Sequence, residues 1–334
     1  SGLLAAIVAV LISWAALIVI AELSVHGVFR QGLFGDPILY MEIGQQIIDG
    51  GVPYTEIAVE HLPSSLLPIV VVAWFYSMVS APEYIVWGAV MGIVFLATVM
   101  VFDLGPWSSK FTFRFVIVAL PTLPLAMERL EVWVVFLTVI ALVLWERDHR
   151  GAGVATFVAT LAKGWPIVLL ALGWLKQRRM AVILTGFASF AALLLVWSQP
   201  LFRSGREFTG IHSETFVGSA ILLARQIRGE PTGLVVSAGA YYVEAGTWAV
   251  ILNLALGCIV LAGGLRIFLQ RKTDTTSTMS MLALLTFGVM IGGPLFSSQF
   301  IFWVTPFIAF ASFRARSQYI GAAVATLCII LWIE

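Results

Sequence analysis

Charged residues are scarce in this chain. Asp, Glu, Lys and Arg make up 11 % of its 334 residues, against about 25 % in an ordinary soluble domain. The scarcity excludes a solvated globular enzyme and a disordered chain, because too few polar side chains are available to face water. Lys and Arg number 19 and Asp and Glu 18, so no field of one sign marks a nucleic acid as a partner.

Cysteine and the common cofactor motifs are also scarce or absent. The two cysteines, Cys258 and Cys328, lie in apolar runs and suit the role of small hydrophobic residues. No Gly-rich phosphate loop, dinucleotide fingerprint or His-Glu-x-x-His motif is present, so roles for ATP, NAD and zinc lack support. We therefore expect no required cofactor and no metal ligands.

Apolar residues are abundant. They make up 60 % of the chain, the mean hydropathy is +0.99, and the apolar runs are continuous and long enough to cross a bilayer. These runs predict an all-α polytopic membrane protein, a single domain over 1–334, with about eleven spans. The first span lacks a small-residue cleavage pattern, so we expect it to be retained. The second and fourth are short, and each could instead be a tilted or re-entrant piece. The expected spans are 3–21, 65–79, 84–102, 111–126, 131–146, 152–175, 180–198, 246–269, 278–293, 299–313 and 317–333.

Two connections are long and polar, 22–64 and 199–245. Long loops in a compact protein are usually functional. If the first helix leaves the cytoplasm, both loops lie outside and the basic clusters at 176–179, 266–272 and 314–316 lie inside, as the positive-inside rule favours. The cluster at 146–150 conflicts with this count, because it then lies outside.

The first long loop contains a candidate catalytic residue. Asp36-Pro37 is typical of a helix start, and Gly50-Gly51 stops the helix. The apolar residues between them predict an interfacial helix lying on the membrane. Asp36 is then either a catalytic base at the membrane surface or only a helix cap, and caps are commoner than catalysts.

A lysine stands near the middle of the expected span 152–175. At a helix centre, Lys163 costs roughly 2.5–3.5 kcal/mol on insertion scales, so its ammonium group should face a cavity or a carboxylate. It either contacts a substrate phosphate or sugar, or forms a structural ion pair with Glu128, Glu131 or Asp103.

The second long loop offers Arg206, His212 and Arg225 as a phosphate site. The alternative is a hydrated loop whose arginines meet lipid headgroups. Glu60 and His61 stand at the mouth of the second span, where the carboxylate either holds sugar hydroxyls or is simply solvated. Trp303, one helical turn from Gln299, is either a lining residue of a donor groove or an interfacial anchor.

Several short motifs occur in an order that resembles the GT-C membrane glycosyltransferases, above all the polyprenyl-phosphomannose-dependent enzymes of family 87. Each motif alone is weak, and the set covers about 33–313. Where that family often has Gly-Gln-x-Asn, this chain has Glu128-Arg-Leu-Glu131. The motifs are Asp36 with Tyr40, Gly51-x-Pro53-Tyr54, Glu60-His61-Leu-Pro63, Lys163-Gly-Trp-Pro166, Ser219 to Arg225, and Ser297-Ser-Gln299-Phe-Ile-Phe-Trp303-x-x-Pro306.

The resemblance implies a GT-C fold and an inverting transfer of a sugar, mannose by likeness. The donor is a polyprenyl-phosphate sugar, the acceptor a lipid-linked or cell-envelope glycan, and the site faces outward from a bacterial plasma membrane. Inversion needs one base, and Asp36 matches it. Tyr40, Glu60, His61, Lys163, Arg206, His212, Arg225 and Gln299 are the expected substrate-binding residues.

Two other functions stay open. A lipid or glycan transporter, or flippase, would use Lys163 and the acidic loop residues as a polar path reaching both faces. A non-catalytic scaffold would need none of these residues. The gathering of polar residues in two loops favours the enzyme.

Overall fold

The computed structural model describes residues 2–25, 35–204, 211–237, 240–271, 274–293 and 298–333. The chain is an α-helical membrane protein: within the described residues, five helices are long and apolar enough to cross a bilayer. These five are α1 (Gly2–Val25), α4 (Glu83–Asp103), α10 (Arg179–Trp197), α13 (Thr247–Leu269) and α14 (Thr275–Gly292).

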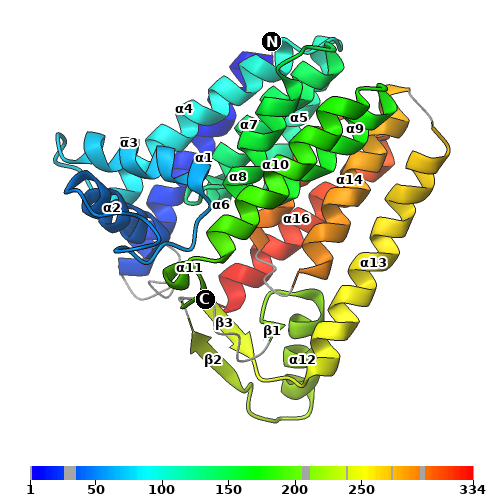
Figure 1. The fold of residues 1–334 in the computed structure, drawn as a ribbon. Coiled ribbons are helices and arrows are strands. Elements are labelled where there is room, and N and C mark those ends of the chain that lie inside the picture. Colours follow the sequence, from blue (N-terminus) through cyan, green and yellow to red (C-terminus); the bar gives the residue numbers. More distant parts are fainter. Residues whose placement is uncertain are drawn as a thin grey trace.

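Shorter elements complete the bundle (Figure 1). The other α-helices are α2 (Gly35–Ile48), α3 (Leu66–Tyr76), α5 (Ser109–Ala119), α6 (Leu123–Met127), α7 (Glu131–Glu146), α8 (Ala152–Lys163), α9 (Leu170–Leu175), α11 (Pro200–Ser204), α12 (Phe216–Ile227), α15 (Thr305–Ile308) and α16 (Phe313–Ile333). The 3-10 helices are η2 (Pro63–Ser65), η3 (Trp165–Leu169) and η4 (Ser298–Val304).

The core of the bundle is aromatic. Phe95, Phe102 and Phe115 are fully buried between α4 and α5, and Phe102 stacks on Phe115 with ring centroids 4.9 Å apart. By contrast, α10 exposes large apolar side chains, among them Phe187 and Leu195. Apolar exposure of this kind on a long apolar helix fits a surface that faces lipid.

Several expected spans are not single helices. The segment 65–79 contains only α3, whose 11 residues rise about 16 Å, too little for a bilayer core of about 30 Å. The segment 111–126 divides into α5 and α6, and 299–313 forms η4 and the single turn α15. Proline accounts for two of these breaks, because Pro124 and Pro306 stand at the first turns of α6 and α15. The structure does not confirm a count of eleven spans.

The expected span 152–175 is instead a re-entrant hairpin. It enters as α8, turns at Gly164, where φ is +27°, and returns as η3 and α9. Its two ends meet, since Arg178 Nε donates to Asp148 Oδ1 at 2.7 Å and Lys176 Nζ lies 3.4 Å from Glu146. The turns α7–α8 and α9–α10 both lie at the upper end in Figure 1. The hairpin therefore places 146–150 beside 176–179 and corrects the conflict in the expected topology.

The first long loop carries α2, which packs across α3 at a glycine. A Cβ on Gly44 would lie 2.5 Å from Ala73 Cβ and 2.7 Å from the Ile69 carbonyl oxygen, so no larger residue fits. Tyr40 and Met41 of α2 are buried, whereas Ile38 is exposed. A helix is thus present where the sequence predicted one, and one of its faces packs on protein.

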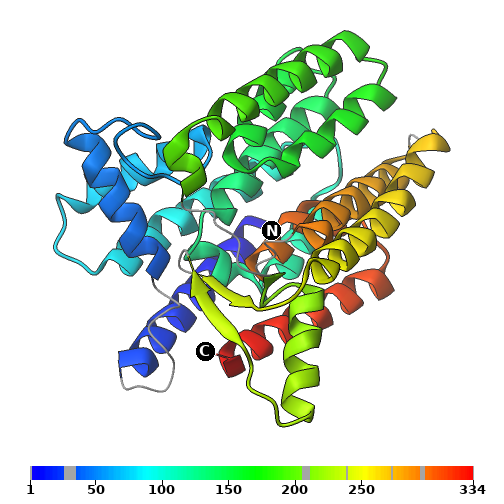
Figure 2. The same ribbon diagram turned by 60° about the horizontal axis from the view of Figure 1, so that its bottom comes forward.

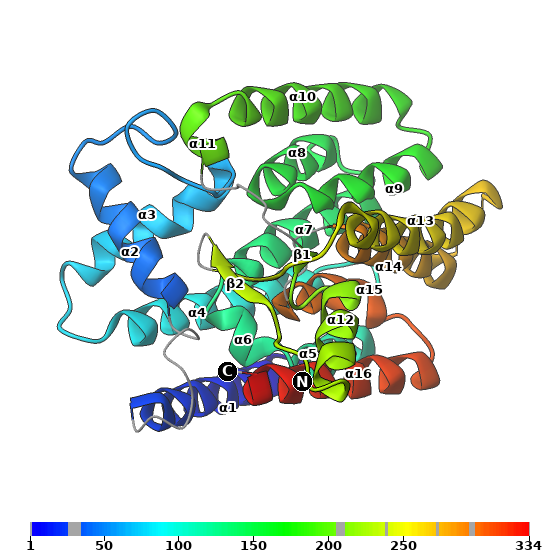
Figure 3. The same ribbon diagram turned by 90° about the horizontal axis from the view of Figure 1, so that it is seen from below.

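The second long loop departs from an all-helical description. It contains a small antiparallel sheet in the order β1-β3-β2 (Figures 2 and 3). In the sequence, α12 lies between β1 and β2. Its strands are β1 (Ile211–His212), β2 (Leu234–Ser237) and β3 (Ala240–Val243). Gly233, just before β2, adopts φ +61°, a backbone conformation that glycine takes without a steric cost.

Candidate functional site

The carboxylate of Asp36 is held by one residue of its own helix and by one residue of another segment. Asp36 stands in the first turn of α2, and its Oδ2 forms an ion pair with Arg129 Nη1, in the turn between α6 and α7. Tyr40 Oη, one helical turn along α2, donates to the same Oδ2 at 3.1 Å. The side chains of Asp36 and Arg129 are 30 % and 21 % exposed. A carboxylate fixed on one oxygen and partly open to solvent can accept a proton through the other.

Tyr40 is itself positioned by aromatic packing. Its ring lies 4.6 Å from that of Trp87 on α4 and 5.1 Å, edge-on, from His61. Burial, and then the charge of Asp36, raise the pKa of Tyr40 well above its usual value, so the phenol stays a proton donor. The His61 carbonyl oxygen accepts a 2.6 Å hydrogen bond from Tyr54 Oη. His61 thus contacts Tyr40 at the site, and its backbone is fixed by the hydrogen bond from Tyr54.

Lys163 lies at the tip of the re-entrant hairpin and meets the start of α7. Its Nζ is 3.5 Å from Glu131 Oε1, and Trp303 Nε1 of η4 donates to Glu131 Oε2 at 2.5 Å. The ammonium group also lies 4.8 Å from the centroid of the Phe300 ring. Glu131 is 2 % exposed and Lys163 32 %. The structural alternative for Lys163 is therefore confirmed with Glu131 as partner, and enough of the cation is exposed to bind an anion too.

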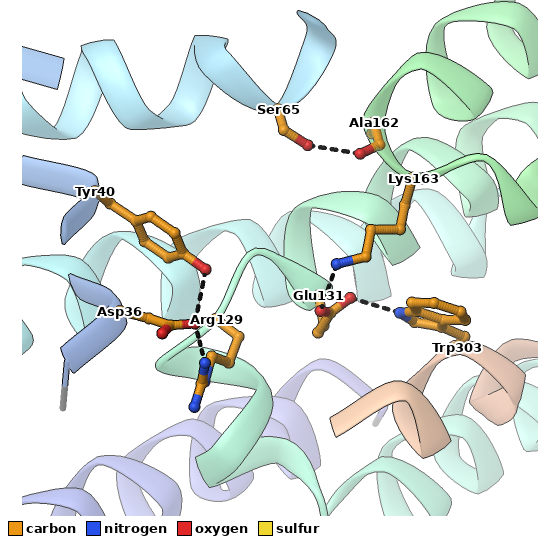
Figure 4. A network of polar contacts seen from close by, with 8 residues as sticks. All are labelled: Asp36, Tyr40, Ser65, Arg129, Glu131, Ala162, Lys163 and Trp303. Atoms are coloured by element: carbon orange, nitrogen blue, oxygen red, sulfur yellow. Dashed lines mark hydrogen bonds and ion pairs between the residues drawn. The ribbon is translucent and has the colours of Figure 1, made fainter. Parts of the chain in front are cut away.

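One short segment connects the two ion pairs. Arg129 and Glu131 are separated only by Leu130, so the Asp36 pair and the Lys163 pair lie beside one another (Figure 4). The tip of the hairpin is fixed there, because Ser65 Oγ donates to the Ala162 carbonyl oxygen at 2.8 Å. Loop one, η2, the α6–α7 turn, the hairpin tip and η4 thus converge on one site.

The second loop reaches this site through Glu214. Burial lowers the pKa of the Arg129 guanidinium, but the negative charges of Asp36 and, less strongly, Glu214 outweigh it and leave the pKa above its usual value. Arg129 therefore stays a cation, with acidic groups from both long loops around it.

The other candidates in the second loop are not gathered at Asp36. His212 lies buried in β1, its ring edge-on to Tyr242 at 5.6 Å, and its Nδ1 accepts from the Glu214 backbone N–H at 3.4 Å. Arg225 donates to the carbonyl oxygens of Thr232 at 2.6 Å and Glu244 at 3.0 Å. Both residues stabilise the sheet and α12 in this structure. The guanidinium of Arg225 binds carbonyl oxygens in this structure, and its role as a phosphate ligand stays a prediction.

Four further candidates have different outcomes. Glu60 is exposed at the end of the first loop. Arg206 lies outside the described residues, as does the side chain of Gln299, whose backbone belongs to η4. Trp303 is buried against Trp165, with stacked rings 5.3 Å apart, so it is a core residue that also orients Glu131.

Sequence reasoning missed Arg129 as a site residue. Its segment stood out only because it departs from the family pattern, and Glu128 and Glu131 were considered only as partners of Lys163. A usable signal was present: three ionisable residues within four positions between two apolar runs. Ionisable groups at membrane depth are functional candidates by default.

The arrangement offers a fixed carboxylate, two cations and neighbouring aromatic rings at one place. Within the described ranges, no group of three or more His, Cys, Asp and Glu side chains could hold a metal ion. In comparisons with known proteins, no protein-family model, no curated protein and no solved structure matches the chain.

Proposed function

We propose that this protein is a membrane glycosyltransferase of the GT-C type. It transfers a sugar, mannose by resemblance, from a polyprenyl-phosphate donor to a lipid-linked or envelope glycan, with inversion. One observation carries the proposal: the candidate base Asp36 and the candidate donor-binding cation Lys163 lie 127 positions apart in sequence but reach the two ends of one three-residue segment, Arg129 to Glu131.

The geometry at Asp36 suits a general base. Within the described residues, Arg129 and Tyr40 both bind Oδ2, which leaves Oδ1 to accept the proton of an acceptor hydroxyl. The ion pair with Arg129 and the hydrogen bond from Tyr40 fix the orientation of the carboxylate. General-base assistance of this kind contributes about 10²–10⁴ in rate.

The leaving group is a lipid phosphate, which needs cationic neutralisation. Lys163 supplies a mobile ammonium group next to the base, and Glu131 holds it while no donor is bound. Phosphate oxygens would replace the single 3.5 Å contact with Glu131. Residues of this chain can therefore neutralise the leaving group.

The re-entrant hairpin also supports an outward-facing site. It returns the polypeptide to the end at which it entered, so 146–150 joins the basic clusters opposite the long loops. Basic residues concentrate on the cytoplasmic side. We therefore place α2, the sheet and Asp36 on the extracytoplasmic face of the plasma membrane.

The alternative, a lipid or glycan transporter, needs a polar path to both faces. In the described part of the chain, the ion pairs Arg129–Asp36 and Lys163–Glu131 lie beside one another (Figure 4), while the pairs Lys176–Glu146 and Arg178–Asp148 join the two ends of the hairpin. This distribution favours an enzyme.

The test is a transfer assay. Purified protein in vesicles would receive radiolabelled polyprenyl-phosphomannose and an envelope lipid extract. Label appearing in a new glycolipid supports the proposal. Movement of the unchanged donor across the bilayer, with no new glycolipid, would overturn it in favour of transport.

A further inference from the structure

A second carboxyl group lies next to Arg129 and has no evident partner. Glu128 directly precedes Arg129, is 2 % exposed, and neither carboxyl oxygen has a hydrogen-bond partner among the described residues. Its surroundings are apolar: a Cβ on Gly88 would lie 3.5 Å from Glu128 Oε1, 3.7 Å from Leu17 Cδ1 and 3.7 Å from Trp14 Cδ1. An ionised carboxylate buried without a partner is very costly, so the group holds a proton instead.

Arg129 has hydrogen-bonding capacity left over. Its Nη1 pairs with Asp36, whereas its buried Nε finds no acceptor in the described residues. A guanidinium presents five donors and cannot be deprotonated in a protein. Arg129 therefore needs a negative charge beside it at all times, and it has two carboxyl groups from which to take one.

We infer that Asp36 and Glu128 are alternative counter-ions of Arg129 and hold one proton between them. In the resting state Asp36 is ionised and Glu128 protonated. When Asp36 gains a proton, Glu128 loses its own, and the guanidinium keeps one negative partner. The catalytic part of this inference rests on the proposed function, whereas the exchange itself does not.

The charges around Glu128 support this exchange. The pKa of Glu128 is raised to about 8 as the net result of three effects. Burial raises the pKa most, Arg129 lowers it, and the charge of Asp36 raises it further. Loss of the Asp36 charge would therefore bring the pKa of Glu128 down. The two carboxyl groups form a coupled pair, whose protons belong to the pair as a whole.

Among the described residues, the other acids on the helices around Glu128 have hydrogen-bond partners of their own. From α1, residues 2–21 contribute no ionisable side chain. On α4, Glu83 accepts from Tyr76 at 2.8 Å and Asp103 from Thr112 at 2.7 Å. The groups left to consider are Tyr40 on α2, Glu131, which binds Lys163 and Trp303, and Glu214, whose charge reaches Arg129.

In catalysis the proton balance is simple. Asp36 takes the proton of the acceptor hydroxyl as its oxygen attacks the sugar, and the bond from the sugar to the phosphate breaks. Protonated Asp36 leaves Arg129 unpaired until Glu128 releases its proton to water. Reversal of the exchange, with loss of the Asp36 proton to solvent, restores the resting state. Glu128 is thus a positioning residue, because it acts through Arg129.

The test is an infrared titration of purified protein without substrate, which follows the carbonyl stretch of a protonated carboxylic acid. We expect native protein to show this band at pH 7 and Glu128→Gln to lack it. We expect Asp36→Asn to shift its titration midpoint down by at least one pH unit, whereas the control Asp49→Asn leaves it unchanged. Asp49 is an exposed acid just beyond α2 that binds Gln45.

Two results would overturn the exchange: no protonated carboxyl at pH 7 in the native protein, or the same midpoint in native and Asp36→Asn. If Glu128→Gln does not fold, the titrations of native protein and Asp36→Asn still decide whether the exchange takes place. Sugar transfer by Glu128→Gln should fall about tenfold and change its dependence on pH, and an unchanged pH profile would overturn the catalytic part. The infrared titration needs no sugar transfer. Failure of the proton exchange can therefore be told apart from failure of the proposed glycosyltransferase function.

Discussion

Asp36 and Arg129 are 93 positions apart in the sequence and form an ion pair in the fold. The pair joins the first long loop to the turn between α6 and α7. It thereby fixes the position of Asp36, the one acidic residue in the first turn of α2. A helix cap needs no such partner. The ion pair therefore favours the functional interpretation of Asp36 over the capping one.

Replacing Arg129 should separate its structural from its catalytic contribution. Arg129→Gln removes the cation from a mostly buried pair, and we expect a loss of about 2–3 kcal/mol in stability together with a strong loss of transfer. Arg129→Lys keeps the charge and should restore part of the activity, although it loses the planar geometry.

Thermal unfolding and transfer rates check this, with Arg178→Gln as the control. Arg178 forms an ion pair with Asp148 at 2.7 Å, but both side chains are exposed, so the control should change stability much less than Arg129→Gln. Full activity in Arg129→Gln would show that Asp36 needs no fixed cation.

Lys163 and Glu131 give a matched pair of variants. Lys163→Met should weaken binding of a polyprenyl phosphate at least tenfold, because a charge-assisted contact with phosphate is lost. Glu131→Gln removes the competing carboxylate and can still accept the bond from Trp303, so donor affinity should be retained or rise. Equilibrium binding of the lipid phosphate measures both. Native affinity in Lys163→Met, with reduced thermal stability, would leave the lysine a purely structural role.

The stability of the protein should depend on pH through Glu128. Because its pKa is about 8 in the folded protein and about 4.5 when exposed, the folded state binds more protons between these values. The contribution of Glu128 to the free energy of unfolding is thus fully present below about pH 4.5 and is lost as pH rises through 8. This contribution is about 5 kcal/mol at most.

Glu128→Gln imitates the protonated group and should lose this dependence. Above pH 8 the variant should unfold at a higher temperature than native protein, as scanning calorimetry in one detergent at several pH values would measure. A native profile as flat as that of the variant would count against a raised pKa for Glu128.

Gly44 should set the position of α2, and with it that of Asp36. Gly44→Ala places a methyl group 2.5 Å from Ala73 Cβ, so α2 must move away from α3, and both stability and transfer should fall. The matched control is Gly321→Ala in α16, where a new Cβ meets nothing within 4 Å. Alanine favours a helix over glycine by about 1 kcal/mol, so the control should be neutral or slightly stabilising. Equal behaviour of the two variants would argue against a role for the α2–α3 contact.

The sequence predicted what local patterns determine. Asp36-Pro37 predicted the start of α2, and the cost of a lysine within an apolar run predicted a carboxylate partner for Lys163, which the structure identifies as Glu131. The helical membrane class followed from composition alone.

What the sequence could not supply depends on contacts between distant segments. Nothing local connects Asp36 with Arg129, so Arg129 was overlooked. The segment 152–175 has the length and hydropathy of a span, and only the meeting of Arg178 with Asp148 identifies it as a hairpin. The small sheet is held by pairing of β1 with β3 across a long stretch of loop, which no local period reveals.

The most direct measurement compares native protein, Asp36→Asn and Asp49→Asn for transfer of radiolabelled mannose from polyprenyl-phosphomannose to envelope lipids. All three should fold and bind the lipid phosphate, since neither change alters side-chain volume appreciably. We predict transfer by native protein and Asp49→Asn, and a loss of at least a hundredfold in Asp36→Asn. Transfer at the native rate by Asp36→Asn would contradict the assignment of Asp36 as the base.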